Sequence, residues 1–466
     1  MTARSINEGS SLTSESIVGG EGKTLDRAAK VTIAAKMYIQ SLLADENENA
    51  AFPIAERAER ILESFLDALE LLCPDSETGP DRARWSGAVR LSMREVLETL
   101  RNIGWHKPGT VSTTVLARAG AETIRWILVD RHAPDAGLWA WLGELFASEY
   151  GDEVLQVNGK NPMVAREYLR ALAYHSALLD QQPLKTGFAI AQIIERSLPD
   201  LLLVRECTET SLYGVDVAQR GMPVRLTRRA TPFAGWRFVT VQAADTLSDI
   251  HGELIRGQHP EGLEEKYPNE LRAAIVHLRR QWSSSPPTRR FRRHLLNARL
   301  SVVHGYEETM NLLGCDATEA VAKGTGTWRI TNMSRSGVGA MSPRPAEGGL
   351  PLAGDLVAFC PEEGTRWHVG VIRRIRTSSS YVEIGIATLS DSPGLALVDD
   401  GRSLRELCVC DPVRPGEVVR LVSSVGVLEN NDPLFVTTPD FVIHKLRPLA
   451  NALRGKSFDL RLYQVT

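Results

Sequence analysis

The spacing of hydrophobic and polar residues changes near residue 200 of the chain. Before that point, apolar residues recur every three or four positions, as in "IAERAERILESFLDALELLC" (54–73), which is the pattern of an amphipathic helix. The same pattern fills "RWSGAVRLSMREVLETLRNIG" (84–104), "VSTTVLARAGAETIRWILVDRH" (111–132), "APDAGLWAWLGELFASEY" (133–150) and "NPMVAREYLRALAYHSALLD" (161–180). We therefore predict an α-helical domain over residues 25–198, after a disordered tail over residues 1–24.

Polar residues that precede the apolar runs indicate where two of these helices begin. Asp135 is placed as an N-cap, and Asn161 is a second cap, followed by Pro162 at the first helical position, where the missing amide hydrogen costs nothing. The large aromatic residues of the helical segments are expected to be core residues and not the lining of a cofactor site: Trp139, Trp141, Phe146 and Tyr168.

After residue 200, apolar and polar residues alternate in short runs separated by Gly and Pro, which is typical of strands. The runs "YGVDVAQ" (213–219), "MPVRLTRRA" (222–230) and "GWRFVTVQA" (235–243) come before one helical segment, "NELRAAIVHLRRQW" (269–282). They predict a small β-rich domain with a helix over 199–282. The following "SSSPP" (283–287) predicts an extended, hydrated hinge.

Short strands with turn residues between them continue from the hinge to residue 466, which favours an antiparallel barrel. We place this barrel at 288–395 and a C-terminal β extension at 396–466. The predicted fold class is multidomain α+β: an all-α N-terminal domain, a small intermediate β-rich domain and a C-terminal β-barrel.

Composition limits the classes of partner and function that the chain can have. The 466 residues are 43% hydrophobic and 24% charged, with a formal net charge of −3, so the chain is not broadly basic and nucleic acid is an improbable partner. No signal peptide or membrane span is visible, and we expect a cytoplasmic protein. The six cysteines are scattered apart from "CVC" (408–410), and no ligand spacing predicts a metal site.

No known catalytic motif is present, and we predict neither an enzyme nor a bound cofactor. "GGEGKT" (19–24) is not a phosphate-binding loop, because Ile17 stands where that motif requires Gly. His304 and His368 are expected to be ordinary strand residues.

Two motifs in the predicted barrel point to a ligand. "TRRFRR" (288–293) contains an R-x-x-x-R at Arg289 and Arg293, and "NMSRSG" (332–337) is an N-x-S-x-x-G. Arginines that lead into a barrel, followed by [D/N]-x-S-x-x-G at a strand end, resemble a PilZ domain, the bacterial receptor module for cyclic di-GMP. "WHVGVIRRI" (367–375) and "VEIGIATL" (382–389) are similar to the paired later strands of that family, the second with its E-x-G-I.

The resemblance covers 288–395 and implies cyclic di-GMP as the ligand, bound by Arg289, Arg290, Arg293, Asn332, Ser334 and Gly337. An arginine fork can pair with a phosphodiester or with guanine O6 and N7. By the same resemblance, Asn332 faces a guanine edge, Ser334 offers a hydroxyl, and Gly337 permits the strand-end turn and a close backbone approach. Ordering of the hinge around the ligand would then change the binding of an unidentified protein partner by the helical domain.

Several features leave alternatives open. Asn332 stands where the family often has Asp, and residues 294–331 form a longer gap than the family usually shows, because "NLLGCDATEAVAKGTG" (311–326) lengthens it. The motifs are also compatible with helix-capping arginines and a plain turn. A degenerate PilZ-like scaffold without nucleotide binding is one alternative function, and a single-stranded RNA binder is a weaker one.

Two further sets of residues in the predicted barrel have less specific interpretations. Arg373, Arg374 and Arg376 are expected to be solvent-facing charges, with extension of the anion site as the alternative. Trp328 and Trp367 are expected in the core, with a stacking platform as the alternative.

Overall fold

The protein divides into two compact units, Met1–Thr288 and Arg289–Thr466, each described here by itself. The computed structural model describes residues 26–43, 54–74, 80–106, 111–150, 156–158, 163–205, 211–216, 222–226, 235–263, 268–283, 287, 291–314, 326–343, 351–362, 364, 366–377, 381–428, 432–438, 441–455 and 457–466. The predicted tail, the centre of the predicted hinge, and the caps Asn161 and Pro162 lie outside these ranges.

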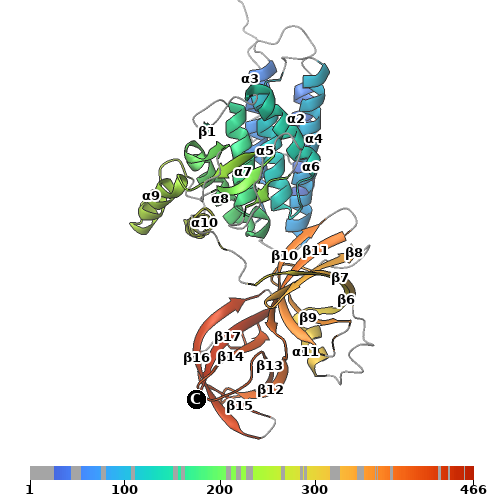
Figure 1. The fold of residues 1–466 in the computed structure, drawn as a ribbon, viewed down its shortest axis with the longest axis vertical. Helices are drawn as coiled ribbons and strands as arrows, with labels where there is room; N and C mark the ends of the chain where they lie inside the picture. Colours follow the sequence, from blue (N-terminus) through green and yellow to red (C-terminus); the bar gives the residue numbers. More distant parts are fainter. Residues whose placement is uncertain are drawn as a thin grey trace, which may run out of the picture. The chain divides into compact units, whose positions relative to one another are not determined.

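The first unit begins with the helices that the periodicity predicted (Figure 1). They are α2 (Arg27–Leu43), α3 (Ile54–Leu71), α4 (Pro80–His106), α5 (Thr113–Val129), α6 (Ala136–Tyr150), α7 (Met163–Ser176) and α8 (Leu184–Ser197). Ser112 caps α5, because its side chain accepts a hydrogen bond from the amide of Val115. Asp135 accepts from the amide of Leu138 at 2.7 Å, which confirms the predicted cap of α6.

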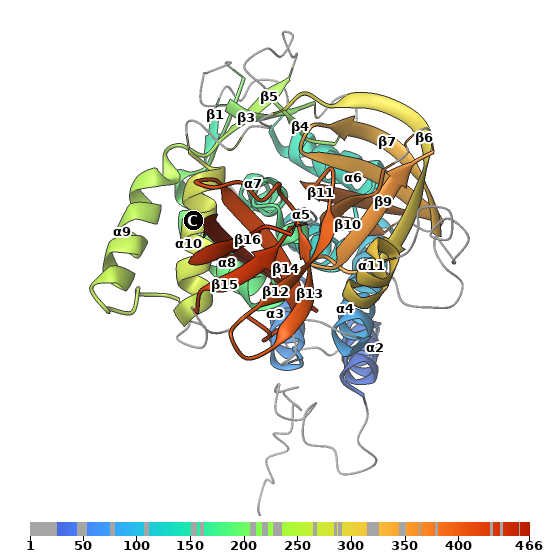
Figure 2. The ribbon, with the colours of Figure 1, turned by 90° about the horizontal axis from the view of Figure 1, so that it is seen from below.

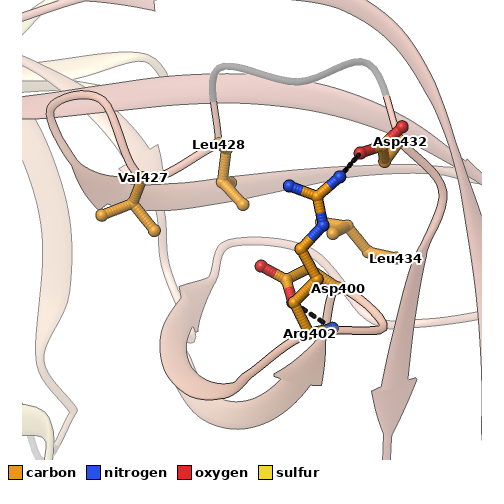
Figure 3. A pocket seen from close by; sticks show the side chains of 6 residues that line it. All are labelled: Asp400, Arg402, Val427, Leu428, Asp432 and Leu434. Carbon is orange, nitrogen blue, oxygen red and sulfur yellow. Dashed lines mark hydrogen bonds and ion pairs between the residues drawn. The ribbon is translucent and has the colours of Figure 1, made fainter.

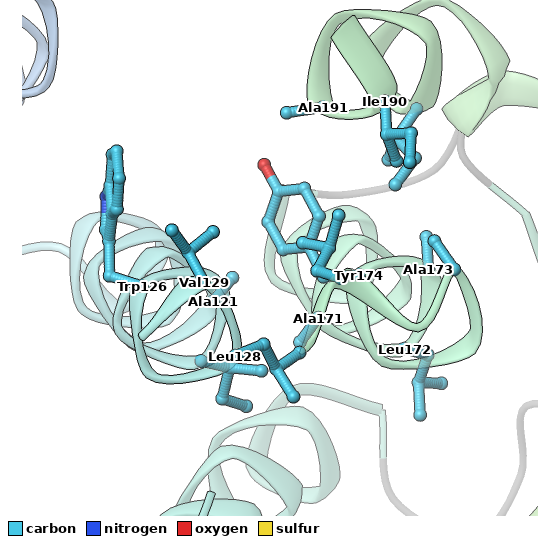
Figure 4. Close-up of a cluster of buried hydrophobic side chains, with 14 of the residues drawn as sticks. Ala121, Trp126, Leu128, Val129, Ala171, Leu172, Ala173, Tyr174, Ile190 and Ala191 are labelled. Atoms are coloured by element: carbon cyan, nitrogen blue, oxygen red, sulfur yellow. The ribbon is translucent and has the colours of Figure 1, made fainter. Parts of the chain in front are cut away.

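Part of the core of this unit lies between α5, α7 and α8 (Figure 4). The indole ring of Trp126 meets Trp85 edge to face, with ring centroids 5.7 Å apart. Of the predicted core aromatics, Trp139, Phe146 and Tyr168 are buried, whereas Trp141 is partly buried and carries the Arg101 guanidinium 5.0 Å from its ring centroid. The core interpretation of these aromatics is confirmed.

A sheet in the order β1-β2-β5-β3-β4 completes the first unit. Its strands are β1 (Gln156–Asn158), β2 (Leu202–Val204), β3 (Ser211–Val215), β4 (Val224–Arg225) and β5 (Trp236–Val239), and α9 (Ala243–Ile255) and α10 (Pro268–Gln281) follow. Leu203, Phe238 and Trp282 belong to the same buried cluster as the helices. The indole of Trp282 donates to the hydroxyl of Ser176 at 2.9 Å. The region 199–282, predicted as a separate domain, therefore shares one core with the helices.

The second unit opens with a closed antiparallel barrel in the order β10-β11-β8-β7-β6-β9 (Figure 1). Its strands are β6 (His294–His304), β7 (Gly326–Ser334), β8 (Gly337–Pro343), β9 (Leu356–Pro361), β10 (His368–Thr377) and β11 (Tyr381–Ser390). Helix α11 (Tyr306–Leu313) covers the outer face of β6 and β9, where Leu312 packs with Val303 and Ala358. Trp328 is buried in the barrel interior, as expected.

A second closed barrel occupies the range predicted as a β extension (Figure 2). Its strands are β12 (Gly394–Asp399), β13 (Leu404–Val409), β14 (Val418–Ser424), β15 (Leu434–Thr437), β16 (Ile443–Arg454) and β17 (Phe458–Val465). In both barrels the strands neighbour one another in the order first, second, third, sixth, fifth, fourth, and the fourth closes on the first. Leu356 and Val371 of the first barrel share a buried cluster with Cys408 and Phe458 of the second.

Candidate ligand-binding site

Residues 291–293 of the arginine motif directly precede the first strand of the first barrel. Arg289 and Arg290 are outside the described residues, while Arg293 is half-buried and directly precedes β6. The predicted residues of the second motif are at the β7–β8 hairpin. Asn332 and Ser334 are among the last three residues of β7, and Gly337 begins β8.

Strand pairing brings the two motifs together. His294 of β6 pairs with Met333 of β7, so Arg293 and Ser334 are the next residues at that end of the ladder. Across the same junction, the guanidinium of Arg335 lies over the ring of Phe291, 5.8 Å from its centroid. Residues far apart in the sequence are therefore neighbours at one end of the barrel.

A β-bulge determines which residues of β7 face outward. Ile330 pairs with Ala340 and Asn332 with Gly339, so Thr331 is an extra residue without a partner in the ladder. Ile330 and Met333 both pack on the interior cluster, although they are three residues apart. The bulge therefore places Asn332 on the outer surface, where a regular strand would have turned it inward.

The Asn332 amide lies flat on the neighbouring strand. A Cβ atom built on Gly339 would lie 2.7 Å from both amide atoms of Asn332, so only glycine leaves room for this arrangement. The Asn332 amide nitrogen donates to the Thr331 hydroxyl at 3.1 Å. Its Oδ1 atom is buried and has no hydrogen-bond partner. This acceptor is thus held beneath the outer face of the barrel with its hydrogen-bonding capacity unused.

Ser334 and Gly337 hold the hairpin. The Ser334 hydroxyl donates to the carbonyl oxygen of Gly337 at 3.3 Å. Gly337 is not among the residues with positive φ, so the turn itself does not require glycine there. A Cβ at Gly337 would instead overlap the carbonyl oxygen of Ile386 in β11. The close backbone approach at Gly337 is therefore made by a neighbouring strand.

Small residues form the outer surface beside these groups. Gly337 pairs with Ala387, and Gly339 pairs with Gly385, across β8 and β11. On the other side of Asn332, its β6 partner Leu295 is 87% exposed. Sequence reasoning did not name Gly339 or Leu295 as site residues. The alternation "GVGA" (337–340) was the available signal for Gly339, because it places two glycines on one face of a strand.

The charge of the site is positive. Among the described residues 291–293 and 332–337, the charged side chains are Arg292, Arg293 and Arg335. A cluster of guanidinium groups beside a side-chain acceptor and a hydroxyl suits an anionic ligand that also carries polar N–H groups. Nothing in this set supplies a nucleophile with a general base.

The pocket in Figure 3 lies elsewhere, in the second barrel. Its lining residues are Asp400, Arg402, Val427, Leu428, Asp432 and Leu434. Its ion pair joins Arg402 and Asp432 with N and O atoms 3.9 Å apart, between side chains that are 76% and 53% exposed. Such an exposed pair adds little stability, and none of the predicted site residues lies there.

Two buried cysteines and the partly buried His368 pack within the barrels. Cys408 and Cys410 are buried free thiols, and a hydrogen bond between them together with burial raises the pKa of Cys408 well above its usual range. The His368 ring stacks on Phe359 with centroids 5.2 Å apart, and burial lowers the pKa of His368. In the described part of the chain, no group of three or more His, Cys, Asp and Glu side chains is arranged to hold a metal ion.

Comparisons with known proteins give no family assignment. No family model matches the chain, and no curated protein matches it either. Among the described helices, none has the length and apolar character needed to cross a membrane.

Proposed function

We propose that the protein is a cyclic di-GMP receptor and that the first barrel binds the ligand on its outer surface, at the end where β6 begins and β7 ends. The observation that carries the proposal is the junction of the two motifs, through the β6–β7 register and the contact between Phe291 and Arg335. Neither motif alone would support a ligand, whereas their meeting gathers arginines, an amide and a hydroxyl at one place.

The ligand's chemistry matches these groups. Cyclic di-GMP carries two phosphodiester anions, for which arginines are bidentate partners. Each guanine also offers N1 and N2 hydrogens, and the buried, unpartnered Oδ1 of Asn332 can accept one of them once the side chain turns outward. The arginine-bearing segment precedes β6, so it can close over a ligand that lies on the barrel. In this proposal the receptor is cytoplasmic, and ordering of that segment changes how the helical unit binds a protein partner.

Calorimetric titration of cyclic di-GMP into the full-length chain and into Arg289→Ala/Arg293→Ala tests the proposal. We expect saturable binding to the unmodified protein and loss of binding in the double variant. Arg279→Ala/Arg280→Ala on α10 is the matched control, because it removes the same charge from another place and should bind normally. No binding to the unmodified protein would overturn the receptor function.

A protein-interaction scaffold is the second candidate, and an apolar surface of the second barrel favours it. Leu397, Phe435 and Ile443 lie on the outer face of β12, β15 and β16 and are 48%, 39% and 66% exposed. In the first barrel, the corresponding face of β6 and β9 is covered by α11. Adjacent exposed apolar residues mark interaction surfaces. A chain that docks a protein here without binding nucleotide would give no heat in the titration.

A further inference from the structure

We propose that Arg374 of β10 is an additional ligand-binding residue, which donates to a phosphodiester of the nucleotide from the side opposite Asn332. This inference rests on the proposed function and extends its site across two more strands. It assigns a ligand-binding role to an arginine outside both sequence motifs.

Strand register places Arg374 in the same row as Asn332. Asn332 of β7 pairs with Gly339 of β8, and Gly339 pairs with Gly385 of β11. Gly385 in turn pairs with Arg374. One row of outward positions therefore runs from the proposed guanine acceptor, over two glycines, to a guanidinium group.

A second β-bulge turns Arg374 outward. Ile372 pairs with Ile386 and Arg374 with Gly385, which leaves Arg373 as the extra residue of β10. Ile372 and Ile375 both pack inside the barrel, three residues apart. The bulges at Thr331 and Arg373 thus lie on the two sides of the same row, and each turns one half-buried polar side chain to the outer face.

The glycines bring the two polar groups near each other. The Arg374 side chain lies over Gly385, where a Cβ atom would be 3.4 Å from the Arg374 Cβ and 3.9 Å from its Nε. The Asn332 amide lies over Gly339 in the same manner. Because β8 and β11 are neighbours, about 4.8 Å apart as strands in a sheet are, one small ligand can touch both groups.

The pair has complementary chemistry for a nucleotide. The unpartnered Oδ1 of Asn332 becomes an acceptor for a guanine N–H when the side chain turns outward from its buried position. The Arg374 fork supplies paired donors for phosphate oxygens. A nucleotide bound by Arg293 alone would be held at one end of the barrel. Contact with Arg374 would fix it along the row, over the glycine pair.

Calorimetric titration of cyclic di-GMP into the full-length chain, Arg374→Gln, Arg374→Lys and Arg373→Gln tests the inference. A charge-assisted hydrogen bond lost from one partner weakens affinity by about 10- to 100-fold, and we expect that loss in Arg374→Gln. Arg374→Lys should lose less, because it retains the charge without the fork. Arg373→Gln is the control, since its exposed side chain belongs to the bulge and not to the row.

The outcomes separate the two proposals. If the unmodified chain binds but Arg374→Gln binds as tightly as Arg373→Gln, then Arg374 is not a ligand and the inference is wrong, while the receptor function stands. If the unmodified chain does not bind, the receptor function fails, and this inference fails with it. Unchanged unfolding midpoints in the variants show that any loss of affinity is not loss of folding.

Discussion

At the residue scale, the candidate site contains glycines at positions where a larger side chain would overlap neighbouring atoms. Gly339 gives space to the Asn332 amide, and Gly337 gives space to the carbonyl oxygen of Ile386. The motif glycine Gly337 therefore stabilises the barrel as well as shaping the site. Its two effects can be separated by measuring folding and binding independently.

Gly337→Ala should destabilise the second unit by about 1–3 kcal/mol, because the added methyl group must displace β11 from β8. The urea midpoint of the full-length chain, followed by far-UV circular dichroism in the β region, measures this. Gly394→Ala is the control, since a Cβ there would meet no atom within 4 Å. Equal midpoints for the two variants would contradict the packing argument.

A partly buried histidine, His277, is expected to give the first unit a pH dependence. Burial lowers the pKa of His277 below its ordinary value of 6.5. Its contribution to stability is present above pH 6.5 and is lost as the pH falls, because the unfolded chain then binds the proton more strongly. The free energy of unfolding should therefore fall more steeply in the unmodified chain than in His277→Gln between about pH 7.5 and 5.5. Parallel profiles in urea titrations at 222 nm would show that His277 does not contribute.

At the element scale, α5, α7 and α8 are joined by charged side chains as well as by apolar packing. Glu122 of α5 is fully buried, accepts from the hydroxyl of Tyr174 at 2.9 Å and pairs with Arg125 at 3.2 Å. Burial would raise the pKa of Glu122, but Arg125 and its neighbours lower it, so the carboxylate stays ionised. Arg170 of α7 continues the network to Glu195 of α8.

Glu122→Gln should cost about 3 kcal/mol of unfolding free energy, because the buried Arg125 loses its fully buried carboxylate partner and keeps only the half-buried Glu70. Glu98→Gln is the matched control. Glu98 pairs with Arg101 at the same i,i+3 spacing, but these side chains are 60% and 39% exposed, and the loss should stay within about 1 kcal/mol. Urea denaturation at 222 nm compares the two, and similar losses would contradict a stabilising buried network.

Elements of the fold were predictable from periodicity, whereas their grouping was not. The helices of 27–197 and the cap Asp135 follow from local pattern and local hydrogen bonding. The shared core of Phe238 with the helices, and the closure of β12 on β15, depend on contacts between distant segments. Alternation in short strands indicates which face is buried, but it does not reveal which strands pair.

The same limit applies to the site. The motifs at Arg293 and Asn332 are visible in the sequence, and their meeting depends on the β6–β7 register. The row that ends at Arg374 depends on bulges at Thr331 and Arg373, and one inserted residue reverses the face of everything beyond it. No local composition signals those insertions here.

At the scale of the whole molecule, the second unit is a tandem of two barrels with one strand order, of which only the first carries the candidate site. On the outer face of the second barrel's β14–β17 pairing, Arg420 stands opposite Leu462, whereas the outer face of β8 and β11 has the pair Gly339 and Gly385. Asp411 there is already held by Arg420. The second barrel thus lacks the small-residue surface and contributes a buried cluster and the exposed face around Phe435.

If ligand binding orders the segment before β6, the overall dimensions of the protein should change. Small-angle scattering of the full-length chain should give different profiles without cyclic di-GMP and at saturation, and Arg289→Ala/Arg293→Ala should show no change. A profile that is unchanged at saturation would exclude the hinge mechanism while leaving binding intact.

Amide hydrogen exchange of the full-length chain, with and without cyclic di-GMP, tests the location of the site most directly. The account predicts ligand-dependent protection in three segments: 288–296, 331–339 and 374–387. The second barrel should exchange at the same rate in both states. Absence of protection in these three segments, or protection confined to the second barrel, would contradict a nucleotide site on the outer surface of the first.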